Sequence, residues 1–560
     1  MGKRALAALA AVLATLGLSA VLIIAEEAPA SEPATAASHD TDWPQWRGPD
    51  RNGVARQSPA LLDEFPKEGP KKVWESEDAI LCGQGAGGNG SIAVFDGRIY
   101  VKEHIVKPAN YRLITTSDLT RLGYCPEMPA DLSKKVEEAR MSEERKRAGS
   151  VWAVSCKEWM DLWIKNNTTA EQSKYETVIR YRLMWGSKAV PLDALAKLVP
   201  IIDKKFEKPA DWVKWVEESG LDADSQASLR ALDRTEEVQE YLYCLSAATG
   251  KTLWKSPMST AADPFTHNYK SSNTPAVSDG KVYVNSVANT VFCFDAGSGK
   301  RLWESAPLGT ENNHGRYSSM LIHQNVAVIV TARGVSAVSA ADGKTMWSVP
   351  GTGLYAAGSA VAWSKGDKWY ILAEFEKHLK MIDPQTGAVI ASALGGGNST
   401  PAIVGDYAAA STPGALRAYK LSPTSLQCIW TVPFNDDFTA PLIDGKYLYV
   451  LGGSDFYGKE TKPGKAMCLE LETGRVMWEE PMSLANYGSL ALADGKLIGV
   501  VGKELVMFRA SPEKFQLVGR TDLSLERWIS PAIADGKVYL RTAKKIVCYD
   551  LAKPRKENGK

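Results

Sequence analysis

The stretch that decides the fold is residues 274–303, which read TPAVSDGKVYVNSVANTVFCFDAGSGKRLW. It contains two short runs of alternating apolar residues on either side of Asp279-Gly280, then a third run, a second turn and a fourth run that ends on Trp303. Asp-Gly between two such runs predicts a tight hairpin, because glycine tolerates the positive φ that the turn needs. The stretch therefore predicts four consecutive antiparallel strands, which we name A to D.

Relatives of this stretch recur along the chain, and their spacing indicates the architecture. A repeat of about 40–50 residues with several strands per unit is typical of a β-propeller, in which each unit forms one blade. The sequence thus predicts an all-β fold, an eight-bladed β-propeller with a helical insertion in the first blade. The expected starts of strand A lie near Ser91, Thr274, Ser318, Gly358, Thr400, Ala440, Ser489 and Ser530.

The last unit is incomplete, and an earlier part of the chain matches what it lacks. Residues 529–551 contain strands A, B and C but no strand that ends on Trp. Lys72-Val73-Trp74-Glu75, which precedes the first blade, matches the missing strand. We therefore expect this segment to pair into the last blade and close the ring, which limits the exposure of sheet edges.

Tryptophan marks strand D of most blades and is expected to lie between neighbouring blades. Burying one Trp of ~200 Å² at ~25 cal/mol/Å² contributes at most about 5 kcal/mol. Two blades lack it, with Ile390 at its place in one and residues 515–518 in the other, so we expect those joints to be weaker. The tryptophans at this position are Trp74, Trp254, Trp303, Trp347, Trp430 and Trp478.

Cysteine recurs at one position of strand C, where it indicates packing rather than chemistry. Ala337, Met381 and Met507 stand there in other blades, so the position favours a small or medium apolar side chain. One cysteine per blade is also too far from the next for a disulfide, which needs Cα atoms within about 7 Å. Cys125 and Cys156 share the insertion and are the pair best placed for a bridge. The four strand-C cysteines are Cys244, Cys293, Cys468 and Cys548.

The first residues predict export. A short basic start and an apolar stretch, residues 1–25, are typical of a secretory signal, and the stretch is also long enough for an uncleaved membrane anchor. Residues 26–41 are rich in Ala, Pro, Glu and Ser and are expected to be a disordered linker. The propeller is expected in residues 42–102 and 240–551, the helical insertion in residues 103–239, and a basic tail in residues 552–560.

The insertion breaks the repeat, because no propeller phrase occurs between strands B and C of the first blade. Residues 158–164, 191–202 and 211–216 carry apolar side chains at helical spacing and predict amphipathic helices. The tryptophans of the insertion are expected to form the core of a small helical subdomain or to face a partner or the propeller. They are Trp152, Trp159, Trp163, Trp185, Trp212 and Trp215.

The Thr-Gly-Lys-x-x-Trp phrase, repeated around eight blades, resembles the quinoprotein alcohol dehydrogenase-like superfamily, whose units are called pyrroloquinoline quinone (PQQ) repeats. The resemblance covers residues 43–74 and 241–551 but not the insertion. Residues 42–53, DWPQWRGPDRNG, look like the segment that opens many exported bacterial members. The resemblance implies the fold and leaves the activity open, because one fold carries many functions.

The superfamily contains at least two functional classes. PQQ dehydrogenases hold the quinone and calcium in the central funnel, whereas scaffold members, such as the propeller subunit of the outer-membrane barrel-assembly machinery, bind proteins and no cofactor. The adjacent cysteines typical of the alcohol dehydrogenases are absent from this chain, as is a Cys-x-x-Cys-His haem site, and the six histidines show no metal-ligand spacing. We therefore expect no cofactor, with PQQ and calcium as the alternative, and we identify no catalytic or metal-binding residue.

Connections from strand D of one blade to strand A of the next open near the central channel, and five of them are rich in polar and aromatic side chains. They are either solvated turns or the walls of a binding funnel on a rigid scaffold. A quinone, a sugar or a peptide end would suit amides, arginines and aromatic rings. The candidate binding residues are His267, Asn268, Tyr269, Asn313, His314, Arg316, Tyr317, Asn435, Asp436, Asn486, Tyr487, Arg527 and Trp528.

These features together predict an exported binding or scaffold protein of the bacterial cell envelope, periplasmic or secreted, with an envelope protein or a small ligand at the funnel. The runner-up is a PQQ-dependent alcohol or sugar dehydrogenase. The net charge of +1 gives no reason to expect nucleic acid as a partner. Membrane contact is expected only through an uncleaved anchor, and we expect a monomer.

Overall fold

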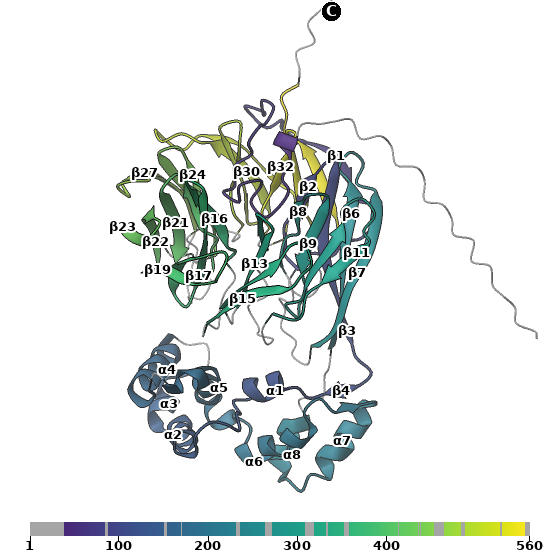
Figure 1. Cartoon of the computed structure of the whole chain (residues 1–560), viewed down its shortest axis with the longest axis vertical. Helices are drawn as coiled ribbons and strands as arrows, with labels where there is room; N and C mark the ends of the chain where they lie inside the picture. Colours follow the sequence, from purple (N-terminus) through teal and green to yellow (C-terminus); the bar gives the residue numbers. More distant parts are fainter. Residues whose placement is uncertain are drawn as a thin grey trace, which may run out of the picture. The chain divides into compact units, whose positions relative to one another are not determined.

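Eight four-stranded antiparallel sheets follow one another along the chain as the blades of a propeller (Figure 1), so the predicted all-β fold is confirmed. The last blade is completed by the strand that precedes the first, as predicted. The computed structural model describes residues 39–83, 88–150, 154–169, 171–230, 236–263, 272–308, 318–331, 334–351, 358–412, 414–434, 436, 438–452, 464–482, 488–526 and 529–554.

In the first four blades, strands A to D follow one another along the chain. The first blade comprises β2 (Ala93–Phe95), β3 (Arg98–Pro108), β6 (Glu236–Ser246) and β7 (Thr252–Asp263), and the second β8 (Ala276–Ser278), β9 (Lys281–Asn285), β10 (Val291–Asp295) and β11 (Arg301–Glu304). The third comprises β12 (Leu321–His323), β13 (Val326–Thr331), β14 (Gly334–Ser339) and β15 (Thr345–Pro350), and the fourth β16 (Val361–Lys365), β17 (Lys368–Phe375), β18 (His378–Ile382) and β19 (Val389–Leu394).

The other four blades repeat the pattern. The fifth comprises β20 (Ala402–Val404), β21 (Tyr407–Thr412), β22 (Ala415–Ser422) and β23 (Ser425–Pro433), and the sixth β24 (Leu442–Asp444), β25 (Tyr447–Gly452), β26 (Gly464–Glu470) and β27 (Val476–Met482). The seventh comprises β28 (Ala491–Ala493), β29 (Lys496–Val501), β30 (Glu504–Arg509) and β31 (Leu517–Asp522), and the eighth β32 (Ala532–Ala534), β33 (Lys537–Arg541), β34 (Ile546–Asp550) and β1 (Lys71–Glu75).

The Asp-Gly hairpins form between strands A and B as predicted. Asp279 has φ 51° and Gly280 has φ 69°, so both central residues of the turn are left-handed. This is the geometry of the tight turn whose twist matches that of the flanking strands.

The recurring position of strand C is a packing position, as predicted. Strand-C residues at this position lie opposite the strand-D tryptophan, for example Cys293 opposite Trp303 and Cys548 opposite Trp74. All four strand-C cysteines are fully buried. Met381 and Met507 occupy the same register in the fourth and seventh blades.

The strand-D tryptophans lie where six of the eight blades meet the next blade. Trp74 donates its indole N–H to the backbone O of Ala247 at 2.9 Å, and Trp347 donates to Pro384 at 2.9 Å, both across a blade boundary. The ring also covers the turn glycine of that next blade, since a Cβ at Gly250 would lie 2.5 Å from the Trp74 ring. The prediction that these tryptophans lie between blades is therefore confirmed.

Two substitutions at the tryptophan position were assigned wrongly from the sequence. The register places Ala391 opposite Met381 and Gly519 opposite Met507, so these residues, not Ile390 and residues 515–518, replace the tryptophan. An isoleucine resembles tryptophan in apolar character more than an alanine does, and this favoured the wrong residue.

Other aromatic side chains fill both of these joints. Trp363 of β16 is buried and donates its indole N–H to the backbone O of Gly405 in the fifth blade at 2.9 Å. Phe65 packs against the backbone of Gly519, where a Cβ would lie 2.3 Å from the Phe65 ring. Both joints therefore contain an aromatic side chain, although neither has the strand-D tryptophan.

The insertion between β3 and β6 is helical, as predicted, with two separate hydrophobic cores. One contains Leu132, Ile179 and their neighbours, and the other contains Trp212 and its neighbours. The helices are α1 (Thr116–Arg121), α2 (Ala130–Met141), α3 (Glu143–Arg147), α4 (Val154–Asn167), α5 (Glu176–Trp185), α6 (Leu192–Ala196), α7 (Pro209–Glu217) and α8 (Ala223–Arg230), with a two-stranded ladder of β4 (Arg112–Leu113) and β5 (Lys205–Phe206).

The insertion is shorter than expected at both ends, because β3 and β6 continue their ladder to the pair Pro108 and Glu236. Charged residues obscured this extension in the sequence, although Lys102 and Glu240 are buried and form an ion pair of 2.6 Å inside it. Cys125 and Cys156 are both free thiols in this structure.

The tryptophans of the insertion mostly serve its own cores. Trp212 is fully buried and stacks on Trp215 with ring centroids 5.3 Å apart, and Trp159 and Trp163 pack against the other core. Trp185 is 43% exposed, and Trp152 lies outside the described residues. Among the described helices, none is both long enough and apolar enough to cross a membrane.

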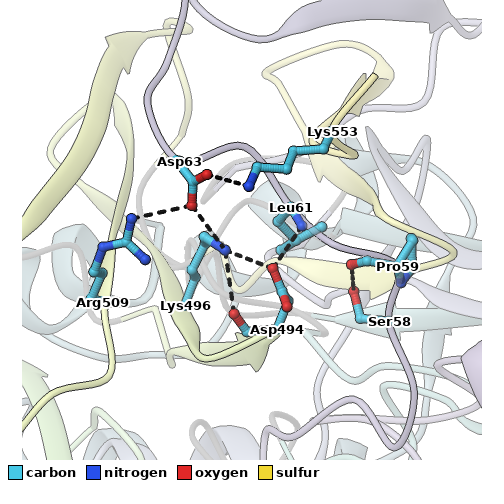
Figure 2. A network of polar contacts seen from close by, with 8 residues as sticks. All are labelled: Ser58, Pro59, Leu61, Asp63, Asp494, Lys496, Arg509 and Lys553. Atoms are coloured by element: carbon cyan, nitrogen blue, oxygen red, sulfur yellow. Dashed lines mark hydrogen bonds and ion pairs between the residues drawn. The ribbon is translucent and has the colours of Figure 1, made fainter. Parts of the chain in front are cut away.

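A polar network fastens the segment before β1 to the seventh blade and to the end of the chain. Figure 2 shows the Asp63 carboxylate facing Lys553, Arg509 and Lys496, with Arg509 Nη2 at 3.1 Å and Lys496 Nζ at 3.9 Å. Asp494, which contacts Lys496, accepts the backbone N–H of Leu61 at 2.7 Å. The network thus joins three parts of the chain that are distant in sequence.

Candidate functional site

The two ends of the central channel differ in what surrounds them. In each blade, strand A runs from the D-to-A connection to the A–B turn, so the connections lie at one end of the channel and the turns at the other. We call these ends the funnel face and the turn face. Because strands alternate in direction, the B–C connections also lie at the funnel face, and the helical insertion is one of them.

A belt of hydroxyl groups links neighbouring blades where strand A begins. The backbone N–H of Ser91 in the first blade donates to Oγ1 of Thr274 in the second at 2.9 Å. The same bond recurs, at 2.9 to 3.4 Å, from Thr274 to Ser319, Ser319 to Ser359, Ser359 to Thr400, Ala440 to Ser489 and Ser489 to Ser530. Between the eighth and first blades the Ser91 hydroxyl instead donates to the backbone O of Ser530 at 2.8 Å. Ala440 has no hydroxyl to accept from Thr400, so the belt is interrupted between the fifth and sixth blades.

Residues 42–55, the channel segment, cross the channel at the middle of strand A. Trp43 exchanges two backbone hydrogen bonds of 2.8 Å with Val94 in the first blade, and Val277 of the second donates to Pro44 at 2.8 Å. Leu492 of the seventh blade donates to Gly53 at 2.7 Å. The backbone of the segment is therefore bonded to three blades.

Two glycines allow the channel segment to turn within this space. Gly48 has φ 79° and Gly53 has φ 85°, and a Cβ would lie 2.9 Å from the Trp43 ring at the first and 2.9 Å from the Leu490 carbonyl O at the second. Only glycine adopts such a conformation without strain. The turns direct Arg47 and Arg51 towards the remaining blades.

Arg51 bonds the third and fourth blades. Its guanidinium donates to the backbone O of Ser319 at 2.9 Å, Met320 at 2.8 Å and Ala360 at 2.9 Å. A further hydrogen bond of 3.3 Å reaches Gln45 Oε1 within the channel segment. One side chain thus holds two blades together.

Arg47 bridges the gap in the hydroxyl belt. Its guanidinium donates to the backbone O of Thr400 at 3.4 Å in the fifth blade and of Pro441 at 2.5 Å in the sixth. Trp46 adds a hydrogen bond of 3.0 Å to Thr400 Oγ1. The channel segment therefore supplies the link that Ala440 leaves out.

The two guanidinium groups lie on the funnel side of the channel segment. Their carbonyl partners precede the middle of strand A by two or three residues, which places them about 7–10 Å nearer the funnel face at ~3.3 Å per residue. Arg47 and Arg51 are each 2% exposed. We call this pair of arginines with the hydroxyl belt the funnel floor.

The funnel floor is strongly cationic. Burial lowers the pKa of Arg47 to about 9, and burial together with the charge of Arg47 lowers the pKa of Arg51 to about 9. Both arginines therefore stay largely charged at neutral pH. Within the described part of the chain, no acidic side chain pairs with either.

Most of the predicted binding residues lie outside the described residues, so their position stays a prediction. Asp436 is described, and its buried carboxylate accepts the N–H groups of Phe438 and Thr439 and the Thr439 hydroxyl. It therefore shapes its own connection. Outside the described residues lie His267, Asn268, Tyr269, Asn313, His314, Arg316, Tyr317, Asn435, Asn486, Tyr487, Arg527 and Trp528.

Sequence reasoning missed three buried charged residues at the funnel end of strand B. Lys102 pairs with Glu240, Glu374 accepts the Ser399 hydroxyl at 3.1 Å, and Arg541 donates to the backbone O of Gly90 at 2.9 Å. The sequence does mark them. Each charged residue follows by two positions the strand-B residue that pairs with the recurring strand-C position, as Lys102 follows Tyr100, the partner of Cys244. Glu374 and Arg541 thereby bond the connections that lead into the next blade.

The described residues do not fit a calcium–quinone site. Among them, no group of three His, Cys, Asp or Glu side chains is arranged to hold a metal ion. The funnel floor offers guanidinium and hydroxyl groups, whereas calcium prefers several carboxylate and carbonyl oxygens that are free to coordinate. The expectation that the chain works without PQQ and calcium stays a prediction.

Comparison with known proteins agrees with the fold. Residues 238–480 match the family model described as outer membrane protein assembly factor BamB. The eight blades, the repeated phrase and this match define a β-propeller built from PQQ-like repeats. This similarity to the family model covers somewhat less than half of the chain.

Three solved structures are similar to this chain at low sequence identity. BamB from Moraxella catarrhalis is 12% identical, covers 57% of this chain and 90% of its own, and has a TM-score of 0.44. A europium-containing methanol dehydrogenase is 10% identical, covers 55% of this chain and 81% of its own, and has a TM-score of 0.40. Quinohemoprotein alcohol dehydrogenase from Comamonas testosteroni is 12% identical, covers 94% of this chain and 83% of its own, and has a TM-score of 0.39. No curated protein matches the chain.

Proposed function

We propose that this chain is an exported binding or scaffold protein of the bacterial cell envelope, which holds an envelope protein or a small ligand at the funnel face. The observation that carries the proposal is the channel segment, whose backbone and arginines bond seven of the eight blades from within the channel. The channel interior is thereby used for structure, and the funnel face is left to present a surface.

The position of the insertion also favours the funnel face as the binding surface. It is the longest B–C connection, and it leaves the first blade at the funnel face through the β3–β6 ladder. Loops on a rigid scaffold commonly carry function. The matched family model is named for an assembly factor of the outer membrane, which agrees with a scaffold in the envelope.

The test combines Arg316→Ala with Arg527→Ala, in two of the predicted connections. Arginine is the side chain best suited to a carboxylate or phosphate of a partner. We expect this double variant to lose capture of the envelope proteins or ligand that the parent retains, with little change in melting temperature. The matched control is Arg301→Ala with Arg475→Ala, two exposed arginines beside C–D turns at the turn face, which should retain capture.

Two results would overturn the proposal. Equal capture by both double variants would place binding away from the funnel connections. Dye-linked oxidation of an alcohol or a sugar by the purified chain after incubation with PQQ and calcium would make it a dehydrogenase instead.

A further inference from the structure

The funnel floor holds two positive charges without a negative one. Arg47 and Arg51 are both 2% exposed, and among the described residues their polar partners are neutral. A buried charge is costly unless it is paired, and hydrogen bonds to carbonyl groups solvate a guanidinium without neutralising it. The guanidinium groups therefore bond several blades at once, and the charge that they carry would be neutralised by an anion.

The donors that remain point to the kind of group that would pair with them. A guanidinium has five N–H groups. Arg51 uses four, on Ala360, Gln45, Met320 and Ser319, and Arg47 uses three, on Thr400, Asn52 and Pro441. Arg47 Nε is buried and has no partner. Three N–H groups are thus left on two adjacent cations.

We propose that the funnel floor binds an oxyanion, the carboxylate or phosphate group of the ligand that the funnel takes. This inference rests on the proposed function, because the oxyanion reaches the floor from the funnel face. The rigid fork of a guanidinium matches carboxylate and phosphate oxygens, and burial strengthens the interaction because water is excluded. The hydrogen bonds to four blades hold both guanidinium groups in place before the ligand arrives.

The experiment measures thermal unfolding of the full chain at pH 7 and constant ionic strength, with sodium chloride replaced stepwise by sodium phosphate or by sodium acetate. Binding to the folded state should raise the melting temperature in a saturable way, by about 1 °C at ten times the dissociation constant. The two salts distinguish a phosphate from a carboxylate. We compare Arg47→Gln and Arg51→Gln with Arg541→Gln, a matched control that also removes a buried arginine bonded to backbone carbonyls.

Phosphate also stabilises proteins by exclusion from their surface, and that effect should be equal in all variants. A saturable rise in the parent and in Arg541→Gln that is lost in Arg47→Gln and Arg51→Gln supports the proposal. Equal rises in all four proteins overturn it. If the floor variants do not fold, crystals of the parent soaked in sodium selenate decide, since no anomalous peak beside Arg47 Nε would contradict the site.

The two proposals can fail separately. Capture of a partner through the funnel connections, with anions acting equally on all variants, would leave the proposed function standing and remove the oxyanion site. The melting temperature could instead rise with phosphate or acetate only where Arg47 and Arg51 are intact, in a chain that captures nothing at the funnel. That result would support the oxyanion site and remove the proposed function.

Discussion

At the residue scale, single charged side chains hold distant parts of the chain together. Asp63 contacts three cations from two other segments (Figure 2). Hydrogen bonds from Lys553 and Arg509 lower the pKa of Asp63. A carboxyl whose pKa is lowered in the folded state stabilises the fold above its unfolded pKa, and this contribution is lost as the pH falls through the folded pKa.

We predict that Asp63→Asn lowers the melting temperature at pH 7 and that the difference from the parent shrinks below about pH 4. Melting curves between pH 7 and pH 2.5 measure this. The control is Asp50→Asn, which removes one exposed ion pair with Arg56 and should change little, because such pairs contribute little. A difference that stays constant down to pH 2.5 would show that the carboxylate charge of Asp63 has no part in it.

The tryptophans between blades allow a second prediction at this scale. Trp347 is 8% exposed and donates a hydrogen bond to the fourth blade, so Trp347→Ala should cost about 3–5 kcal/mol of unfolding free energy. Urea denaturation measures it. Trp185→Ala, at a position that is 43% exposed in the insertion, should lie within about 0.5 kcal/mol of the parent. Similar losses of unfolding free energy in both variants would contradict the role of Trp347 at the joint between two blades.

At the element scale, the long ladder of β3 and β6 separates the insertion from the first blade. The ladder runs from Arg98 and Ser246 to Pro108 and Glu236, so the two ends of the insertion start from paired residues. The two cores of the insertion consist of its own residues. The insertion can therefore be removed without opening the core of a blade.

We predict that a short Gly/Ser linker in place of residues 109–235 leaves a folded ring, because the ends are adjacent and removal of a surface insertion costs little. Circular dichroism and a cooperative melt check this. The control removes residues 102–240, which also takes away the buried Lys102–Glu240 pair and the top of the ladder, and should be clearly less stable. An unfolded 109–235 replacement would mean that the ring depends on the insertion.

At the scale of the whole molecule, the ring is closed twice by residues that precede the first blade. β1 pairs with β34 as strand D of the eighth blade, and the channel segment bonds other blades from inside. Closure removes a free sheet edge and makes each blade depend on both of its neighbours.

We predict that deletion of residues 42–75 abolishes cooperative unfolding or causes aggregation, since it removes both closures at once. Calorimetry and light scattering measure the outcome. The variant without residues 109–235 is the control, because it loses far more residues and should still unfold cooperatively. A deletion variant that melts like the parent would disprove the closure.

The sequence alone determined the blade count, the closing strand, the strand-C packing position and the helical character of the insertion. Each of these depends on local pattern: alternation, Asp-Gly turns and the position of Trp relative to Gly. The residue that replaces the tryptophan was harder to identify, because Ile390 is the more apolar of two neighbours, whereas the C–D pairing places Ala391 opposite Met381.

Only the tertiary structure decided what residues 42–55 do. Their contacts lie up to several hundred residues away in sequence, as between Arg47 and Pro441 or between Arg51 and Ser319. No local pattern encodes which carbonyl groups meet a side chain at the axis of a ring. The funnel floor, the gap at Ala440 and its bridging by Arg47 exist only because the ring brings together the first residues of strand A from eight repeats.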